Sequence, residues 1–489
     1  MTRASLIPFF LLLATLGLAE GQEPPLGPTV GHVAPDEATL WLHAPAAKRV
    51  VELKLNGVAR TVPFERLGRG FGVLRVSGLT PETSYKVKAS VPGAGEFDLR
   101  FATPPLPRAW GKVRFGVGSC MRFPKQPVWK VVAKEAPEFF VWLGDTVYYK
   151  RHPGGGADWD SVDSMLKRQL AGRRVPGLLQ VMRSMPCYSV WDDHDYGPND
   201  SNRSFALRAE SRLVHRYLWA ANPGFGQDEQ GVYFNFRRGP LEFFLLDGRS
   251  FKSTIRGIPR PQREVYGKRQ LDWLKKGLLR SNAPLKVIGS GVQALFGYAP
   301  AEGWFEARTE REAFMTWLKA HDVGPVLFLS GDIHVSELYQ KELAPGRNLW
   351  ELTSSGLAAD AFGFQAFFEK ANRPERRWVV TKPNVCFVEI DIPRDPKRLA
   401  ESTLRFVSKS AADGKILAET KTTFASFGSK KANKAPAPGA PGGRKQLGAD
   451  DVNPPHAALL GGFAPKLGRG DGLAACSRIG VQPSLGGSA

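Results

Sequence analysis

Carboxylate and imidazole side chains directly follow three apolar segments of the sequence. These segments end at Leu143, Trp191 and Ser330. The acidic and histidine residues that follow them are Asp145, the run Asp-Asp-His-Asp at 192–195, and Asp332 with His334. Ligands of open α/β sheets bind beyond the carboxyl ends of the strands. The side chains are therefore candidates for one shared site.

The chemistry of such a site is that of a metal cluster. Several acids at one sheet edge repel one another unless cations neutralise them. Carboxylates suit hard cations and imidazole suits transition metals, so we expect a mixed-metal site. One Gly-Asp pair alone is more often structural, because Asp commonly caps a helix. Three strand ends, which contain two of the eight histidines (His194 and His334), favour the metal site.

The strand ends belong to a larger ordered set of motifs. The motifs are GSC at 118–120, LGDTVYY at 143–149, WDDHDYGPND at 191–200, LDGRSF at 246–251, GVQ at 291–293 and SGDIHVSEL at 330–338. The set resembles the alkaline phosphatase D (PhoD-like) branch of the metallophosphoesterases, and the resemblance covers roughly residues 27–425. It implies a four-layer α/β/β/α core and an extracytoplasmic phosphomonoesterase or phosphodiesterase that uses iron together with calcium.

The resemblance also implies a role for each site residue. The implied iron ligands are Cys120, Asp145, Tyr148 and His334. The implied calcium ligands are Asp145, Asp332 and Asn199, and a different divalent pair is the alternative to iron and calcium. Asp193 or His194 would lie beside the second metal or the leaving group, and Arg249 would hold phosphate oxygens.

The residue types suit these roles. A thiolate and a phenolate are strong donors to a ferric ion, although Cys120 alone would read as a buried thiol and Tyr148 alone as a packed aromatic. The planar guanidinium of Arg249 suits phosphate oxygens, and its alternative partner is Asp247 in a salt bridge.

The mechanism that we expect is direct in-line displacement. A hydroxide held between metal ions would attack phosphorus, while the cations and Arg249 neutralise the developing charge. His194 is the candidate that protonates the leaving oxygen. No covalent phospho-enzyme is expected, although Ser119 is near the site.

Two regions with different strand patterns precede the C-terminal segment. Residues 27–104 read as a small β-sandwich of the fibronectin type III kind, because short strands alternate with Gly and Pro turns. Residues 112–427 read as the α/β catalytic domain. Its predicted strands are 113–118, 139–143, 188–191, 241–246, 285–289, 326–330 and 349–354, followed by antiparallel strands at 386–392, 402–407 and 416–424. Its predicted helices are 160–185, 203–221, 268–280 and 310–320.

The two ends of the chain indicate export and a flexible tail. Residues 1–21 have a basic start at Arg3, an apolar run at 6–19 and then small residues, as in a secretory signal peptide; a retained anchor is the alternative. Arg3 has no arginine neighbour, so a general secretory signal is expected instead of the family's common twin-arginine route. Residues 428–489 are of low complexity. We expect a periplasmic, cell-surface or secreted protein without a transmembrane helix, in which Cys187 and Cys386 are buried thiols.

The net charge of the chain does not decide between several classes of binding partner. The 67 Lys and Arg residues exceed the 47 Asp and Glu residues, for a formal charge of +20. The basic residues are dispersed, so no stable nucleic-acid complex is expected, and phosphate mono- or diesters are the expected substrates. The alternatives are a non-catalytic extracytoplasmic binding protein that retains the hydrolase fold, and a related enzyme for nucleotides or phospholipid head groups. The oligomeric state stays open.

Overall fold

The computed structural model describes residues 25–428 except 48, 107–110, 225–229, 255–256, 298–301, 362 and 394. The predicted signal peptide at 1–21 and all but the first residue of the predicted tail lie outside these residues. Within the described part of the chain, no helix is long and apolar enough to cross a membrane.

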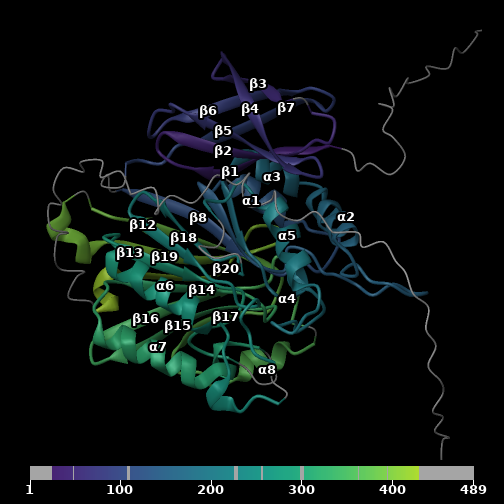
Figure 1. Ribbon diagram of the computed structural model, residues 1–489. Coiled ribbons are helices and arrows are strands. Elements are labelled where there is room, and N and C mark those ends of the chain that lie inside the picture. Colours follow the sequence, from purple (N-terminus) through teal and green to yellow (C-terminus); the bar gives the residue numbers. More distant parts are fainter. Residues whose placement is uncertain are drawn as a thin grey trace, which may run out of the picture. The chain divides into compact units, whose positions relative to one another are not determined.

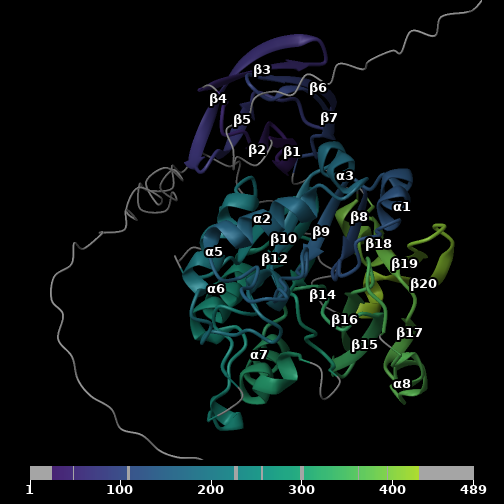
Figure 2. The ribbon, with the colours of Figure 1, turned by 90° about the vertical axis from the view of Figure 1, so that its right-hand side faces the viewer.

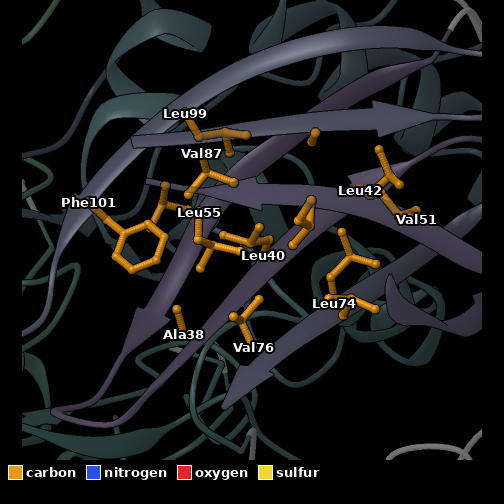
Figure 3. Close-up of a cluster of buried hydrophobic side chains, with 14 of the residues drawn as sticks. Ala38, Leu40, Leu42, Val51, Leu55, Leu74, Val76, Val87, Leu99 and Phe101 are labelled. Atoms are coloured by element: carbon orange, nitrogen blue, oxygen red, sulfur yellow. The ribbon is translucent and has the colours of Figure 1, made fainter. Parts of the chain in front are cut away.

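The N-terminal strands form a β-domain around one apolar core. Its strands are β1 (Leu26–Val33), β2 (Glu37–His43), β3 (Val50–Leu55), β4 (Val58–Gly68), β5 (Phe71–Ser77), β6 (Ser84–Val91) and β7 (Gly95–Ala102). They pair antiparallel in the order β1-β2-β5-β4-β3-β6-β7, and the long β4 pairs with both β5 and β3. Leu40 and Leu74 from one part of the sheet meet Leu55 and Val87 from the other (Figure 3). The fibronectin type III-like assignment of this domain stays a prediction.

Two further sheets form the α/β core. The first has the order β10-β9-β8-β18-β19-β20 and the second the order β11-β12-β13-β14-β16-β15-β17. The strands of the first are β8 (Lys112–Gly118), β9 (Phe139–Leu143), β10 (Cys187–Val190), β18 (Asn384–Asp391), β19 (Thr403–Ser410) and β20 (Ile416–Thr423). The strands of the second are β11 (Phe234–Arg238), β12 (Leu241–Leu245), β13 (Leu285–Gly289), β14 (Val326–Ser330), β15 (Ser336–Ala344), β16 (Arg347–Ser354) and β17 (Arg376–Val380).

The two sheets pack face to face through aromatic side chains. Phe243 of β12 lies edge-on to Phe115 of β8 and Phe139 of β9, with ring centroids 5.3 and 5.5 Å apart. Trp350 of β16 stacks on Phe406 of β19 at 5.7 Å. Because β8, β9 and β10 run parallel, as do β12, β13, β14 and β16, each sheet collects the carboxyl ends of these strands at one edge.

Helices cover the outer faces of both sheets (Figures 1 and 2). The helices of eight residues or more are α1 (Val128–Glu135), α2 (Val162–Arg173), α5 (Arg208–Leu218), α6 (Gly267–Arg280) and α7 (Arg308–Ala320). Leu274 of α6 and Phe314 of α7 pack with Phe328 of β14, whereas Trp129 of α1 lies 5.0 Å from Trp142 of β9. Figure 2 shows α6 on one side of the paired sheets and α1 on the other. The α/β prediction is confirmed.

Most predicted elements are confirmed, but one predicted helix is wrong. The strands predicted at 139–143, 285–289 and 326–330 have the same bounds in the structure, and β18, β19 and β20 are antiparallel as expected. The predicted helix 160–185 consists of α2 and the separate α3 (Leu178–Ser184). Pro176 and Gly177 break it, because Gly177 has φ +86° and proline cannot continue a helix. The predicted helix 203–221 is shortened to α5, and β11, β15 and β17 were not predicted.

The β-domain contacts the α/β core through buried aromatic and basic side chains. The Arg173 guanidinium lies 4.5 Å from the ring of Trp41 in β2 and 4.5 Å from the ring of Trp219. Trp41 Nε1 donates to the carbonyl of Tyr217 at 2.7 Å. His32 Nδ1 lies 3.1 Å from the hydroxyl of Tyr188 in β10. We call this set the domain contact.

Candidate metal centre

The predicted ligands lie in short turns that follow the strands. Cys120 follows β8, Asp145 follows β9, and Asp332 and His334 follow β14. All four have left-handed backbone angles, with φ of 67°, 55°, 74° and 57°. Non-glycine residues adopt this region at a cost, and such residues cluster at functional sites. The local backbone therefore marks the same residues as the sequence motifs.

Cys120, Asp145, Tyr148 and His334 form the first half of the centre, which we call the thiol group. Cys120 Sγ lies 3.4 Å from Asp145 Oδ2, and the hydroxyl of Tyr148 donates to the same oxygen at 2.8 Å. That hydroxyl also lies 2.9 Å from His334 Nε2. Donor atoms that share one metal at about 2.0–2.3 Å are themselves about 3 Å apart. The thiol group therefore has the spacing that a transition metal needs.

Burial disfavours the charged forms of the side chains in the thiol group. Burial and the neighbouring Asp145 raise the pKa of Cys120 and of Tyr148 well above their usual values. Burial, together with the charges of His194 and Arg122, lowers the pKa of His334 to about 4. His334 is thus neutral at pH 7, which is the form that binds metals. A bound cation would favour the thiolate and phenolate.

The second half of the centre is a carboxylate group formed by Asp192, Asp193 and Asp332. Their ligand oxygens lie within 4.8 Å of one another. Burial and the adjacent aspartates raise the pKa of Asp332 well above its usual value, and burial raises that of Asp192. Burial also opposes ionisation of Asp193, but Arg249 and His194 outweigh it and lower its pKa. Asp192 Oδ2 is buried and has no hydrogen-bond partner among the described residues, as expected of an oxygen that can ligate a cation.

Arg249 is the fully buried cation of the carboxylate group. Its Nε lies 2.5 Å from Asp192 Oδ1, and its Nη1 donates to Glu302. Its Nη2 lies 3.9 Å from Asp193 Oδ1 and has no hydrogen-bond partner in the described part of the chain. The alternative salt bridge to Asp247 is wrong, because Asp247 Oδ1 accepts the backbone N–H of Arg249 instead.

His194 and Asn199 occupy different surroundings. The ring of His194 stacks on Tyr148 with centroids 4.0 Å apart, and its ligand atom lies within 4.8 Å of those of Asp145 and Asp193. The structure thus brings His194 to the junction of the two halves. Asn199 is exposed in the turn after α4 (Asp193–Tyr196), where the next residue, Asp200, donates its N–H to Asp193. A calcium-binding role for Asn199 stays a prediction.

Comparison with known proteins adds independent support for the resemblance. A family model described as PhoD-like phosphatase matches residues 115–392, which contain all the predicted site residues. The chain belongs to the PhoD-like phosphatase family. Alkaline phosphatase D of Bacillus subtilis (strain 168) is 23% identical over an alignment of 270 residues, with a coverage of 46% of this chain and 46% of that protein. The chain thus matches about half the length of this relative.

Two solved structures share the fold of this PhoD-like chain. A structure of PhoD covers 81% of this chain and 88% of its own, with a TM-score of 0.64 and 17% identity. The purple acid phosphatase PPD1 from yellow lupin covers 82% of this chain and 74% of its own, with a TM-score of 0.60 and 12% identity. At these identities, both comparisons concern the fold.

The structure of this PhoD-like chain also reveals site residues that the sequence did not single out. Asp195 Oδ1 accepts the backbone N–H of Thr146 at 2.8 Å, and its Oδ2 accepts that of Asp192 at 3.2 Å. It therefore ties the Asp145 turn to the carboxylate group. Lys252 and Glu302 form a buried ion pair beside Arg249. For Asp195 the charged run at 192–195 was a signal, whereas Glu302 lies in no motif.

Proposed function

We propose that the chain is an exported, metal-dependent phosphoesterase that hydrolyses phosphate monoesters or diesters. The observation that carries this proposal is the convergence of Cys120 Sγ, Asp145 Oδ2, the Tyr148 hydroxyl and His334 Nε2 beside a carboxylate group. Asp145 lies between a soft donor, the sulfur of Cys120, and the hard oxygen donors of the carboxylate group. This donor set suits a transition metal next to a hard cation, for which iron and calcium are proposed.

Each predicted residue has a place in this proposal. Iron would be held by Cys120, Asp145, Tyr148 and His334, and calcium by Asp145, Asp332 and Asn199. Bound cations would supply Lewis acidity to the phosphoryl group and to the attacking water. The proposed role of Arg249 Nη2 is to donate to a phosphate oxygen, because the other guanidinium nitrogens already have carboxylate partners.

His194 is the proposed proton donor to the leaving oxygen. Its Nδ1 is buried without a hydrogen-bond partner among the described residues, so this nitrogen is available for a substrate or a cation. The stacked ring of Tyr148 and the hydrogen bond from the His194 backbone to Asp193 Oδ1 fix the position of the side chain. Asp193 would then orient His194 or contact the second metal.

Export and the type of β-domain are supported by smaller observations. The apolar run at 6–19 has the length of a signal-peptide core. In the β-domain, the hydroxyl of Tyr85 accepts the backbone N–H of Thr80 at 2.8 Å. A tyrosine that bonds back to the chain before a late strand is typical of immunoglobulin-like sandwiches and supports the fibronectin type III-like proposal.

The direct test is hydrolysis of one monoester and one diester by the chain from about residue 22, with elemental analysis of the same sample. Asp145→Asn should lower turnover at least about a hundredfold, because it removes a charge shared by both halves of the centre. Exposed Asp391→Asn is the matched control and should leave turnover unchanged. A folded wild-type protein that binds neither iron nor calcium and cleaves neither ester would contradict the proposal and favour the non-catalytic binding protein.

A further inference from the structure

The hydroxyl of Ser355 lies between two predicted metal ligands that come from different strands. Ser355 directly follows β16 and is fully buried. Its Oγ lies 3.1 Å from Cys120 Sγ and accepts the backbone N–H of His334 at 2.8 Å. We propose that Ser355 is a positioning residue of the metal centre, which donates a hydrogen bond to the Cys120 thiolate and holds the His334 turn. The inference rests on the ligand roles of Cys120 and His334 in the proposed function.

The direction of the hydrogen bond follows from the chemistry of the groups. A serine hydroxyl has one hydrogen to donate and can accept at its oxygen. The oxygen of Ser355 already accepts from His334, so its hydrogen remains for another acceptor. Metal-bound cysteine is a thiolate and has no hydrogen. In the metal-loaded protein, the bond between Ser355 and Cys120 can therefore run only from the hydroxyl to the sulfur.

Ser119 provides a natural comparison on the other side of the same sulfur. Its Oγ lies 3.3 Å from Cys120 Sγ, and it is as buried as Ser355. The Ser119 hydroxyl, however, donates its hydrogen to the carbonyl of Ser354 at 3.1 Å. Two hydroxyls thus flank the sulfur at similar distances, but among the described residues the Ser119 hydroxyl has a carbonyl as an alternative acceptor, whereas the Ser355 hydroxyl does not.

The backbone around Ser355 is rigid enough to position the ligands. The N–H of Leu357 donates to the carbonyl of Ser119 at 3.2 Å, and that of Ala358 donates to the carbonyl of Cys120 at 3.1 Å. The segment after β16 is therefore hydrogen-bonded along the Cys120 turn. Ser355 adds a bond to the left-handed His334 turn and so joins the ends of β8, β14 and β16. Hydrogen bonds to metal ligands commonly tune both affinity and electronic properties.

Cobalt(II) binding to the metal-free protein tests this role without an activity assay. Cobalt is the probe, and the readouts are its affinity and the thiolate-to-cobalt charge-transfer absorption. Ser355→Ala should weaken cobalt binding by about tenfold or more and move the absorption to lower energy, because the thiolate loses its donor. Ser119→Ala, the matched single-atom deletion, should leave both readouts unchanged.

Each outcome separates this inference from the proposed function. A wild-type charge-transfer band that is unchanged in Ser355→Ala overturns the inference alone. If wild-type protein binds cobalt without a charge-transfer band, Cys120 is not a ligand, and the proposed ligand set falls with the inference. If Ser355→Ala does not fold, Ser355→Thr and Ser355→Val repeat the comparison with side chains of equal shape. The threonine variant should keep the wild-type band position, and the valine variant should move the band to lower energy.

Discussion

The metal centre and the domain contact both bury ionisable side chains, but they compensate them differently. At the domain contact, Arg173 faces the rings of Trp41 and Trp219 and donates to the carbonyl of Leu218 at 2.6 Å. Burial lowers the pKa of Arg173 to about 9, so it stays charged at pH 7. Aromatic faces and a carbonyl dipole attract this cation without any ion from solution.

In the metal centre, other protein groups do not compensate the buried negative charge to the same extent. Burial and the surrounding aspartates raise the pKa of Asp145 well above its usual value, and a buried oxygen of Asp192 has no hydrogen-bond partner among the described residues. Arg249 and Lys252 offset only part of the negative charge, because both also bind Glu302. The protein itself stabilises the charge at the domain contact, whereas in the proposed function bound cations would compensate the charge of the centre.

The largest expected effect is at Arg249. Arg249→Met leaves Asp192 and Glu302 without their buried cation, so the free energy of unfolding should fall by about 3–5 kcal/mol. Phosphate-ester hydrolysis should also fall about a hundredfold, because a donor to the phosphate is lost. Urea unfolding and steady-state kinetics measure the two losses.

Arg249→Lys is the matched control for charge. It keeps the positive charge but lacks the planar fork, so it should retain more stability than Arg249→Met. If Arg249→Met were as stable as wild type in the metal-free protein, the carboxylate group would not depend on this cation.

Trp41→Ala tests whether the domain contact is independent of the metal centre. Trp41→Ala removes a buried ring and one face of the Arg173 site, so the free energy of unfolding should fall by about 3–5 kcal/mol. Iron and calcium contents and kcat/KM should stay unchanged at temperatures where the variant is folded. A loss of metal without a loss of stability would show that the two regions are not independent.

The smallest expected effect is a pH dependence at the domain contact. Burial and the nearby Arg238 and Arg75 lower the pKa of His32 to about 3, against 6.5 for an exposed histidine. Between these values the unfolded chain binds a proton that the folded chain does not, so this contribution to stability is complete above about pH 6.5 and is lost as the pH falls. His32→Gln should lessen the loss of stability between about pH 7 and pH 5 in urea unfolding. An equal loss in both proteins would exclude His32 as a cause.

The sequence predicted the parts of the site that depend on local pattern. Asp145, Asp332 and His334 follow strands whose apolar runs are unbroken, so their place at the sheet edge was evident. Cys120 and Tyr148 could be assigned to the site only from the resemblance, because either residue alone looks like a core residue. The apolar runs and the motifs both concern short stretches of chain. The structure brings Cys120, Asp145, Tyr148 and His334 together and groups Asp332 with Asp192 and Asp193.

Long-range contacts account for what the sequence did not predict. The hydrogen bond between Ser355 and Cys120 joins residues 235 positions apart, and the ion pair between Arg249 and Glu302 joins residues 53 positions apart. Neither Ser355 nor Glu302 stands in a motif or a periodic pattern. The error at 160–185 had a local cause, because apolar residues at helical spacing stand on both sides of Pro176-Gly177.

Unfolding of the metal-free protein with and without added cations tests the central claim most directly. Ions that bind only the folded state should raise the unfolding midpoint. The free energy of unfolding should rise by about 2.7 kcal/mol when the free ion concentration is a hundred times its dissociation constant. We predict this rise for wild type with iron and calcium, and its loss in Asp145→Asn. Equal midpoints of the wild-type protein with and without the cations would contradict the claim that the centre is completed by bound metal.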